Sequence, residues 1–257
     1  MPERKNYKML PFPRERGVIA DAGWLDARRH LVYGLLETDV TCVRRFIRER
    51  KADGENLSFT GFIVKCLAKA IETHPMTHAF RDWLGRLIIF DDVDVVTMIE
   101  TEKNGVALPH IIRAANRKSF QEISAEIHAI QSRPMQSEQK RGINRLAPYA
   151  PGLLRRAFFR VLLKNPFWVR KFTGTTILTS VGMFGKGTAW GIAFLPWYTT
   201  GVTVGGIAEK PAWIGGRVEP REYLSVTLTF DHDIVDGAPA ARFANTFKEY
   251  VESGYGS

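Results

Sequence analysis

The stretch Phe230-Asp231-His232-Asp233-Ile234-Val235-Asp236-Gly237-Ala238 joins the last predicted strand to the last predicted helix. Residues 223–231 alternate polar and apolar side chains, which is typical of a strand. Gly237 then releases the chain into a helix, predicted over 237–251. A histidine at a strand end is held by the sheet and faces whatever lies beyond it. This setting suits a general base, which needs a fixed position and a pKa near neutral. The spacing alone fits a surface histidine beside a helix-capping aspartate equally well.

Outward from this stretch, the pattern predicts helices and strands that do not alternate regularly. The predicted helices lie at 15–28, after Thr41, from Ser58 to Pro75 and at 119–130. The predicted strands lie at 30–38, 86–90, 93–100, 106–113, 175–181, 188–194 and 202–207. This order favours one α/β sandwich, a mixed sheet covered by helices, over a regular βαβ array. The glycine pairs at 205–206 and 215–216 lack the GxGxxG spacing of a dinucleotide site.

The composition is that of a globular chain. It has 257 residues, 45% hydrophobic and 25% charged, and no apolar run of membrane-spanning length. The first 17 residues lack an apolar signal core, and only two cysteines occur, Cys42 and Cys66. We therefore expect a single domain over 1–257, reduced thiols and a cytoplasmic location. The histidines form no metal-ligand spacing, so no metal is expected.

The positive charge is concentrated in residues 134–172. This segment holds nine basic residues and one acidic residue, a net charge of +8 out of +9 for the chain. Because the remainder is nearly neutral, a nucleic-acid-binding face is not expected. Three alternatives stay open for the aromatic-rich part, 151–172. It packs against a neighbouring subunit, it forms a channel wall whose Arg155 and Arg156 bind the phosphates of a cofactor, or it docks on an anionic membrane surface.

Six blocks of the sequence, in order, resemble one family. They are Arg16–Ala20, Glu37–Thr41, Leu57–Pro75, Gly105–Ser124, Leu178–Gly185 and the HxxxDG motif formed by His232, Asp236 and Gly237. Together they resemble the acyltransferase (E2) catalytic domains of 2-oxoacid dehydrogenase complexes. The resemblance implies the chloramphenicol acetyltransferase-like fold, a two-layer sandwich, and coenzyme A or acyl-CoA as a substrate. Residues 134–172 are then a basic, aromatic-rich insertion.

The resemblance also implies the roles of individual residues. His232 would be the general base, and the hydroxyl of Thr179 would stabilise the oxyanion. Ser180 is adjacent, but successive strand residues face opposite sides, so only one of the two can serve. Ser180 and Gly182 would lie beside coenzyme A. Asp236 would pair with the arginine of the opening helix, Arg16 or failing that Arg14, to support the loop.

The family's active site lies between the subunits of a trimer, so the resemblance implies a homotrimer. His232 would come from one subunit and Thr179 from its neighbour. No lipoyl domain and no lipoyl group are expected on this chain, so the acceptor could be a lipoyl domain on another protein. Asp233 stands where many similar sequences have Arg. Its charge could raise the pKa of His232 or face water.

Three functions follow as hypotheses. The first is transfer of an acyl group between coenzyme A and a dihydrolipoyl thiol. The second is a stand-alone acyltransferase for a small hydroxyl, amine or lipid acceptor. The third, from a different class, is a non-catalytic scaffold subunit of a dehydrogenase complex.

Overall fold

The computed structural model describes residues 8–100, 107–132, 149–181 and 187–256. One six-stranded sheet has the order β1-β8-β7-β6-β4-β5, and a small ribbon pairs β2 with β3. The strands are β1 (Leu31–Asp39), β2 (Phe80–Arg81), β3 (Leu87–Ile88), β4 (Val95–Glu100), β5 (Ala107–Ile112), β6 (Thr176–Ser180), β7 (Thr200–Ile214) and β8 (Arg217–Asp231). The helices are α1 (Arg14–Asp26), α2 (Thr41–Ala52), α3 (Phe59–Thr73), the short η1 (Pro75–His78), α4 (Phe120–Ser132), α6 (Gly152–Leu163), α7 (Pro166–Thr173) and α8 (Gly237–Glu252).

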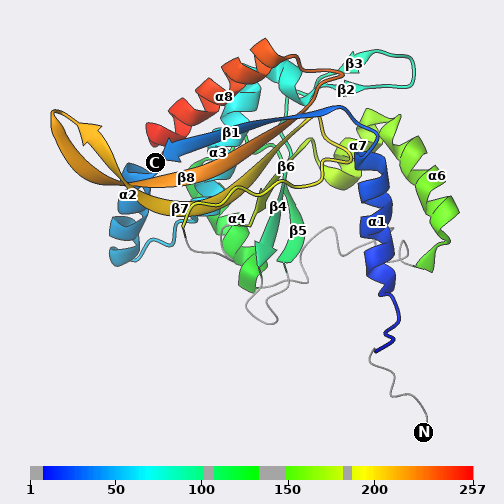
Figure 1. Cartoon of the computed structure of the whole chain (residues 1–257), viewed down its shortest axis with the longest axis horizontal. Coiled ribbons are helices and arrows are strands. Elements are labelled where there is room, and N and C mark those ends of the chain that lie inside the picture. The colour runs from blue at the N-terminus through cyan, green and yellow to red at the C-terminus, as the bar shows by residue number, and fades with distance from the viewer. Residues whose placement is uncertain (1–7, 101–106, 133–148, 182–186, 257) are drawn as a thin grey trace, which may run out of the picture.

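The sheet is mixed, as the sequence predicts. Strand β6 runs parallel to both β4 and β7, while the other neighbouring strands are antiparallel. Helices α3, α4 and α8 cover one face of it (Figure 1). Phe62, Leu67 and Phe243 from these helices are fully buried in the main core. The predicted two-layer sandwich is therefore confirmed.

Helix α3 begins where the sequence predicts. The side chain of Ser58 accepts a hydrogen bond from the backbone N–H of Gly61 at 3.2 Å, which satisfies one of the free donors of the first turn. Its apolar residues recur at helical spacing and are buried along one stripe. Pro75 follows directly and opens the short η1 turn instead of continuing α3.

A second, smaller core lies at one end of the sheet. There α1, α6 and α7 come together (Figure 1). Leu25 of α1, Phe159 and Leu162 of α6 and Val169 of α7 are buried with Phe80 of the β2-β3 ribbon. The part of the basic segment that the structure describes, from residue 149 on, therefore packs against the chain's own first helix. No helix within the described ranges is long and apolar enough to span a bilayer.

Two local predictions differ from the structure. Residues 188–194 form no strand; they run across β7, where the N–H of Gly206 donates to the carbonyl of Ala189 at 2.9 Å. A Cβ at Gly205 or Gly206 would collide with the backbone of this segment, so the close approach requires glycine there. Strands β7 and β8 are also longer than predicted. Gly215 and Gly216, both at positive φ, close them into one long hairpin.

Candidate active site

The loop between β8 and α8 is a tight turn fixed at both ends. The backbone carbonyl of Asp231 accepts hydrogen bonds from the N–H groups of Ile234 (3.1 Å) and Val235 (2.9 Å). Val235 is 2% exposed and packs into the main core. Asp236 occupies the N-cap position of α8, which starts at Gly237. His232 lies between these fixed points.

Asp231 is the buried anchor of the loop. Its carboxylate Oδ2 lies 2.5 Å from Nη2 of Arg29, and Nη1 of the same arginine donates to the carbonyl of Leu195 at 3.1 Å. The other oxygen, Oδ1, accepts the backbone N–H of Asp233 at 3.2 Å. The side chains of Asp231 and Arg29 are 9% and 17% exposed, so each needs the other's charge. Sequence reasoning missed this pair; an acidic residue at the buried end of a strand was the available signal.

The imidazole of His232 projects out of this anchored loop. The backbone N–H of His232 donates to the carbonyl of His30 at 2.8 Å, and the side chain is 47% exposed. Its Nδ1 lies 4.0 Å from Oδ1 of Asp236, beyond hydrogen-bond distance, and that carboxylate is 84% exposed. The ring is thus open to substrate, and the Asp236 carboxylate lies near it without a hydrogen bond.

The predicted pair between Asp236 and Arg16 is not formed within the described part of one chain. Arg16 is exposed in the first turn of α1, and Arg14 lies over the ring of Tyr149. The end of α1 that adjoins the loop is its C-terminal end, where Arg29 follows. Arg16 lies 13 residues earlier, roughly 20 Å away along a helix. Geometry therefore gives the supporting role to Arg29 and Asp231.

Asp233 is partly exposed to water, at 40% of its side chain, and contacts His30 instead of the base. Its Oδ1 lies 2.8 Å from Nδ1 of His30, and its Oδ2 lies 4.0 Å from Nη2 of Arg81. The hydrogen bond from His30 lowers the pKa of the Asp233 carboxyl, with further lowering from the charges of His30, Arg81 and Arg29. The same hydrogen bond raises the pKa of His30 above its ordinary value.

Thr179 and Ser180 lie on opposite faces of β6. Leu178, and with it Ser180, points to the helix-covered face, because Leu178 belongs to the main core. Thr179 points to the other face together with Ile177, which packs against Leu195 and Tyr198. On that face the neighbouring Thr203 is 3% exposed beneath the segment around Gly191, while Leu35 on the edge strand β1 is 58% exposed. Thr179 itself is partly exposed there, so its hydroxyl is the one that a ligand on this face can reach.

One chain does not bring Thr179 and His232 together. Thr179 pairs in register with Thr203, and Thr203 pairs with Thr227. His232 follows five residues after Thr227, and the two side chains are separated by two strand spacings. At about 3.4 Å per residue and 4.8 Å per strand, they are roughly 15–20 Å apart.

Arg155 and Arg156 bind a side chain of their own chain. The Nε atoms of Arg155 and Arg156 donate to Oδ2 and Oδ1 of Asp21 at 2.5 and 2.6 Å. Burial raises the pKa of the Asp21 carboxyl, but the hydrogen bonds from Arg156 and Arg155 outweigh it, and the pKa is held below its usual value. Asp21 is 2% exposed and the Arg155 side chain 10% exposed. The two guanidinium groups expected to bind phosphates therefore join α6 to α1, because a buried carboxylate requires cationic partners.

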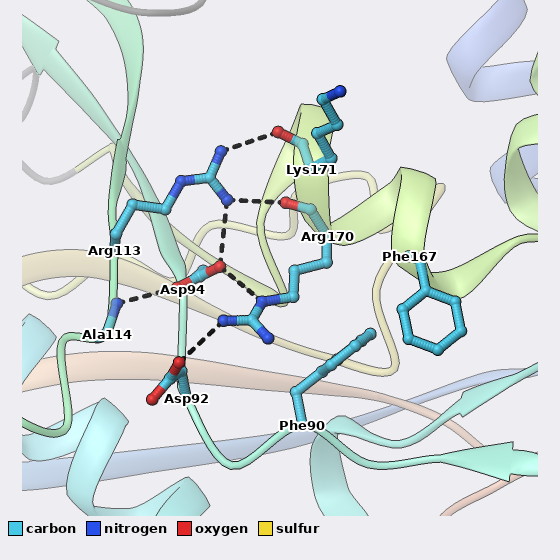
Figure 2. Close-up of a pocket in the computed structure, with 8 residues that line it drawn as sticks. All are labelled: Phe90, Asp92, Asp94, Arg113, Ala114, Phe167, Arg170 and Lys171. Atoms are coloured by element: carbon cyan, nitrogen blue, oxygen red, sulfur yellow. Dashed lines mark hydrogen bonds and ion pairs between the residues drawn. The ribbon is translucent and has the colours of Figure 1, made fainter.

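Arg170 also serves the fold. Figure 2 shows it between Asp92 and Asp94, beside a hollow of about 450 Å³. Its Nε and Nη2 donate to Asp94 and Asp92, each at 3.0 Å, and Arg113 donates to Asp94 at 3.1 Å. The two carboxylates that line this hollow, Asp92 and Asp94, are already paired with its arginines. We therefore assign the network to the attachment of α7 to the sheet.

Membrane docking by residues 151–172 stays a prediction. Arg155, Arg156 and Arg170 are paired internally, which leaves Arg160, Lys164 and Lys171 on the exposed side. Among the large apolar residues of this segment, four are more than 50% exposed: Leu153, Leu154, Val161 and Phe167.

Two remaining predictions concern Gly182 and metals. Gly182 lies outside the described residues, as does the part of the basic segment before residue 149. Within the described ranges, no group of three or more His, Cys, Asp or Glu side chains could hold a metal ion.

The fold and the histidine loop together define a class. Chloramphenicol acetyltransferase has the same fold as this chain. The two structures superpose with a TM-score of 0.53 at 16% identity, over 94% of this chain and 96% of that enzyme. The chain belongs to the family of 2-oxoacid dehydrogenase acyltransferases (catalytic domain), whose profile matches residues 29–141 and 169–255. The sequence-based resemblance is thereby confirmed.

Known proteins of this family resemble the chain over most of its length. It is 27% identical over 205 residues to a probable dihydrolipoyllysine-residue succinyltransferase of Schizosaccharomyces pombe, covering 79% of this chain and 39% of that protein. It is 26% identical over 259 residues to a dihydrolipoyllysine-residue acetyltransferase of Rickettsia conorii, covering 97% and 54%. The chain thus spans about half or less of the length of these relatives. Azotobacter vinelandii dihydrolipoamide acetyltransferase has the same fold, with a TM-score of 0.74 at 19% identity over 98% of this chain and 93% of that chain.

Proposed function

We propose that the chain transfers an acyl group between coenzyme A and a thiol acceptor, with His232 as the general base. The observation that carries the proposal is the half-exposed imidazole at the end of β8, in a loop fixed by the buried Arg29–Asp231 pair. Such a histidine can exchange protons while its position stays constant. Family membership supports thioester chemistry at this loop. The names of the relatives support a dihydrolipoyl group as the acceptor.

In the proposed reaction, His232 takes one proton from the acceptor and returns it to the leaving group. The imidazole removes the proton from the acceptor thiol as its sulfur attacks the carbonyl carbon of the acyl-CoA thioester. The resulting oxyanion accepts a hydrogen bond from the hydroxyl of Thr179, and this charge stabilisation lowers the barrier. When the intermediate collapses, the carbon–sulfur bond to coenzyme A breaks. The departing thiolate then takes the proton from the imidazolium, which restores His232.

We place the complete site between two copies of the chain. Within one chain, Thr179 and His232 are roughly 15–20 Å apart, too far to act on one carbonyl group. Thr179 also shares its face with the exposed apolar side chain of Leu35, which a second copy would cover. A homotrimer with three such sites, and a lipoyl-bearing protein as acceptor partner, complete the proposal. A cytoplasmic location belongs to it as well, and cell fractionation tests that.

The test is acyl exchange with defined donors. Purified protein is mixed with acetyl-, branched-chain or long-chain acyl-CoA and free dihydrolipoamide, and both products are separated by chromatography. The proposal predicts stoichiometric release of coenzyme A and formation of acyl-dihydrolipoamide with at least one donor. Release without any acyl-dihydrolipoamide would point to another acceptor. No release with any donor would favour the scaffold hypothesis.

Replacing Thr179 by alanine is expected to lower kcat by several hundredfold, because one oxyanion donor contributes roughly 3–4 kcal/mol to transition-state stabilisation. Thr179→Ser keeps the hydroxyl and should retain most of the activity. Ser180→Ala is the matched control on the opposite face: its expected place beside coenzyme A affects KM for acyl-CoA, while kcat should stay close to that of the unchanged protein. Steady-state kinetics measure all three variants. If Ser180→Ala alone lost activity, the oxyanion donor would have been placed on the wrong residue.

A further inference from the structure

His30 and Asp233 tie the base to the neighbouring strand through two separate bonds. The backbone carbonyl of His30 accepts the N–H of His232 at 2.8 Å. The ring of His30 bonds the carboxylate of Asp233, also at 2.8 Å. His232 and Asp233 are thus both held by His30, which directly precedes β1. A displacement of these two residues, which would re-aim the imidazole, has to break at least one of the two contacts.

The other side of the loop offers the imidazole little support. Asp236 is 84% exposed, and a Cβ placed on Gly237 would meet no atom within 4 Å. The aim of the ring therefore depends on the side held by His30 and Asp233. Behind that side lies a cavity of about 220 Å³, lined by Arg81, Asp233 and Ile234 among others. When the contact is lost, the side chain of Asp233 has room to shift into this space and to loosen the adjoining His232, while Asp231 and Val235 stay anchored.

The charges around the pair make its strength depend on pH. The charged groups that act on it are Arg81 on β2, Arg29 after α1 and Asp231 at the end of β8. The hydrogen bond from Asp233 favours the charged form of His30 and raises its pKa. The charged pair is therefore complete between the lowered pKa of Asp233 and the raised pKa of His30, and it loses its positive charge as pH rises through the latter.

We propose that Asp233 and His30 are positioning residues that aim His232 and make acyl transfer fall off at alkaline pH. This inference rests on the proposed function, because acyl transfer is its readout. His232 has to be uncharged to accept a proton, so activity first rises with pH. Loss of the charge on His30 then loosens the loop, and kcat declines. The acceptor thiol becomes more ionised over the same range, which by itself would raise the rate.

The experiment compares pH profiles of kcat and KM for acyl exchange. For the unchanged protein we expect a bell-shaped kcat profile. His30→Gln and Asp233→Asn should lower kcat at the optimum about threefold, as the loss of one exposed ion pair would, and abolish the alkaline decline while KM for acyl-CoA stays constant. Arg86→Gln removes the exposed cation of another ion pair, to Asp82, whose carboxylate keeps the backbone N–H groups of Leu84 and Arg86, and it serves as the matched control with an unchanged profile. A decline that persists in His30→Gln would overturn the proposal.

Ring-labelled histidines followed by NMR provide a readout independent of turnover. The His232 signal should show an inflection at the midpoint of His30, and the inflection should be missing in His30→Gln. If the unchanged protein has no activity but this coupling is present, the proposed function fails and the coupling of the two residues stands. If the protein is active but the His232 signal shows no inflection at the midpoint of His30, the positioning role is contradicted.

Discussion

His232→Ala is expected to lower kcat for acyl transfer about a thousandfold, within the range that general acid–base catalysis contributes. The variant keeps Thr179 and the binding surface, so KM for acyl-CoA should stay within about twofold of its starting value. The fold should persist, because the ring is 47% exposed and the loop is anchored by Arg29 and Asp231 instead.

The control for this variant is another histidine. His128 lies on α4, where its Nδ1 is 2.8 Å from Oε1 of Gln131. His128→Gln should leave kcat unchanged. Steady-state kinetics and the circular dichroism spectrum of both variants are measured together. Turnover unaffected in His232→Ala would refute the mechanism.

Asp94→Ala is expected to lower the free energy of unfolding by roughly 3–5 kcal/mol, the effect of removing one partner from a buried ion pair. The Asp94 side chain is 2% exposed and accepts three hydrogen bonds within the network of Figure 2. They come from Arg113 (3.1 Å), Arg170 (3.0 Å) and the backbone N–H of Ala114 (2.8 Å). Alanine leaves these donors without their acceptor and weakens the attachment of α7, which keeps the Arg170–Asp92 pair and the bonds from Arg113 to the carbonyls of Arg170 and Lys171. Urea denaturation measures the loss.

Asp92 provides the matched control for the stability prediction. Its carboxylate is 30% exposed and holds Arg170 and Arg117 at the edge of the same network. Asp92→Ala should cost about 1 kcal/mol or less, as exposed ion pairs do. Equal losses in the two variants would show that Asp94 is no special anchor.

Local signals were enough to predict much of the fold. The Ser58 cap, the apolar stripe that follows and Pro75 lie close together in the sequence, and α3 forms where they indicate. The end of β8 and the start of α8 are equally local, so the His232 loop was found from its own residues. Alternation failed at 188–194, because a segment lying across a sheet also has one covered and one exposed side.

The long-range partners could not be predicted. Asp231 is 202 positions from Arg29, and Asp21 is 134 positions from Arg155. Many arginines are available for each buried carboxylate, and only the packing of α1 against α6 and the β8 loop selects among them. For the same reason, Arg155 and Arg156 resembled a free phosphate-binding pair. Thr179 and His232 lie far apart within one chain because of the order of the strands in the sheet, and no sequence motif reveals that order.

Mixed trimers test the central claim most directly. His232→Ala and Thr179→Ala chains, each with a different affinity tag, are co-expressed, and assemblies carrying both tags are assayed for acyl exchange. If the base of one copy acts with the hydroxyl of the next, every trimer that carries both tags has one intact pairing among its three sites. Activity should then rise to about a third of that of the unchanged protein, far above either variant alone. If the mixed assemblies are no more active than the two variants, the two side chains do not meet across a subunit boundary, and the account is contradicted.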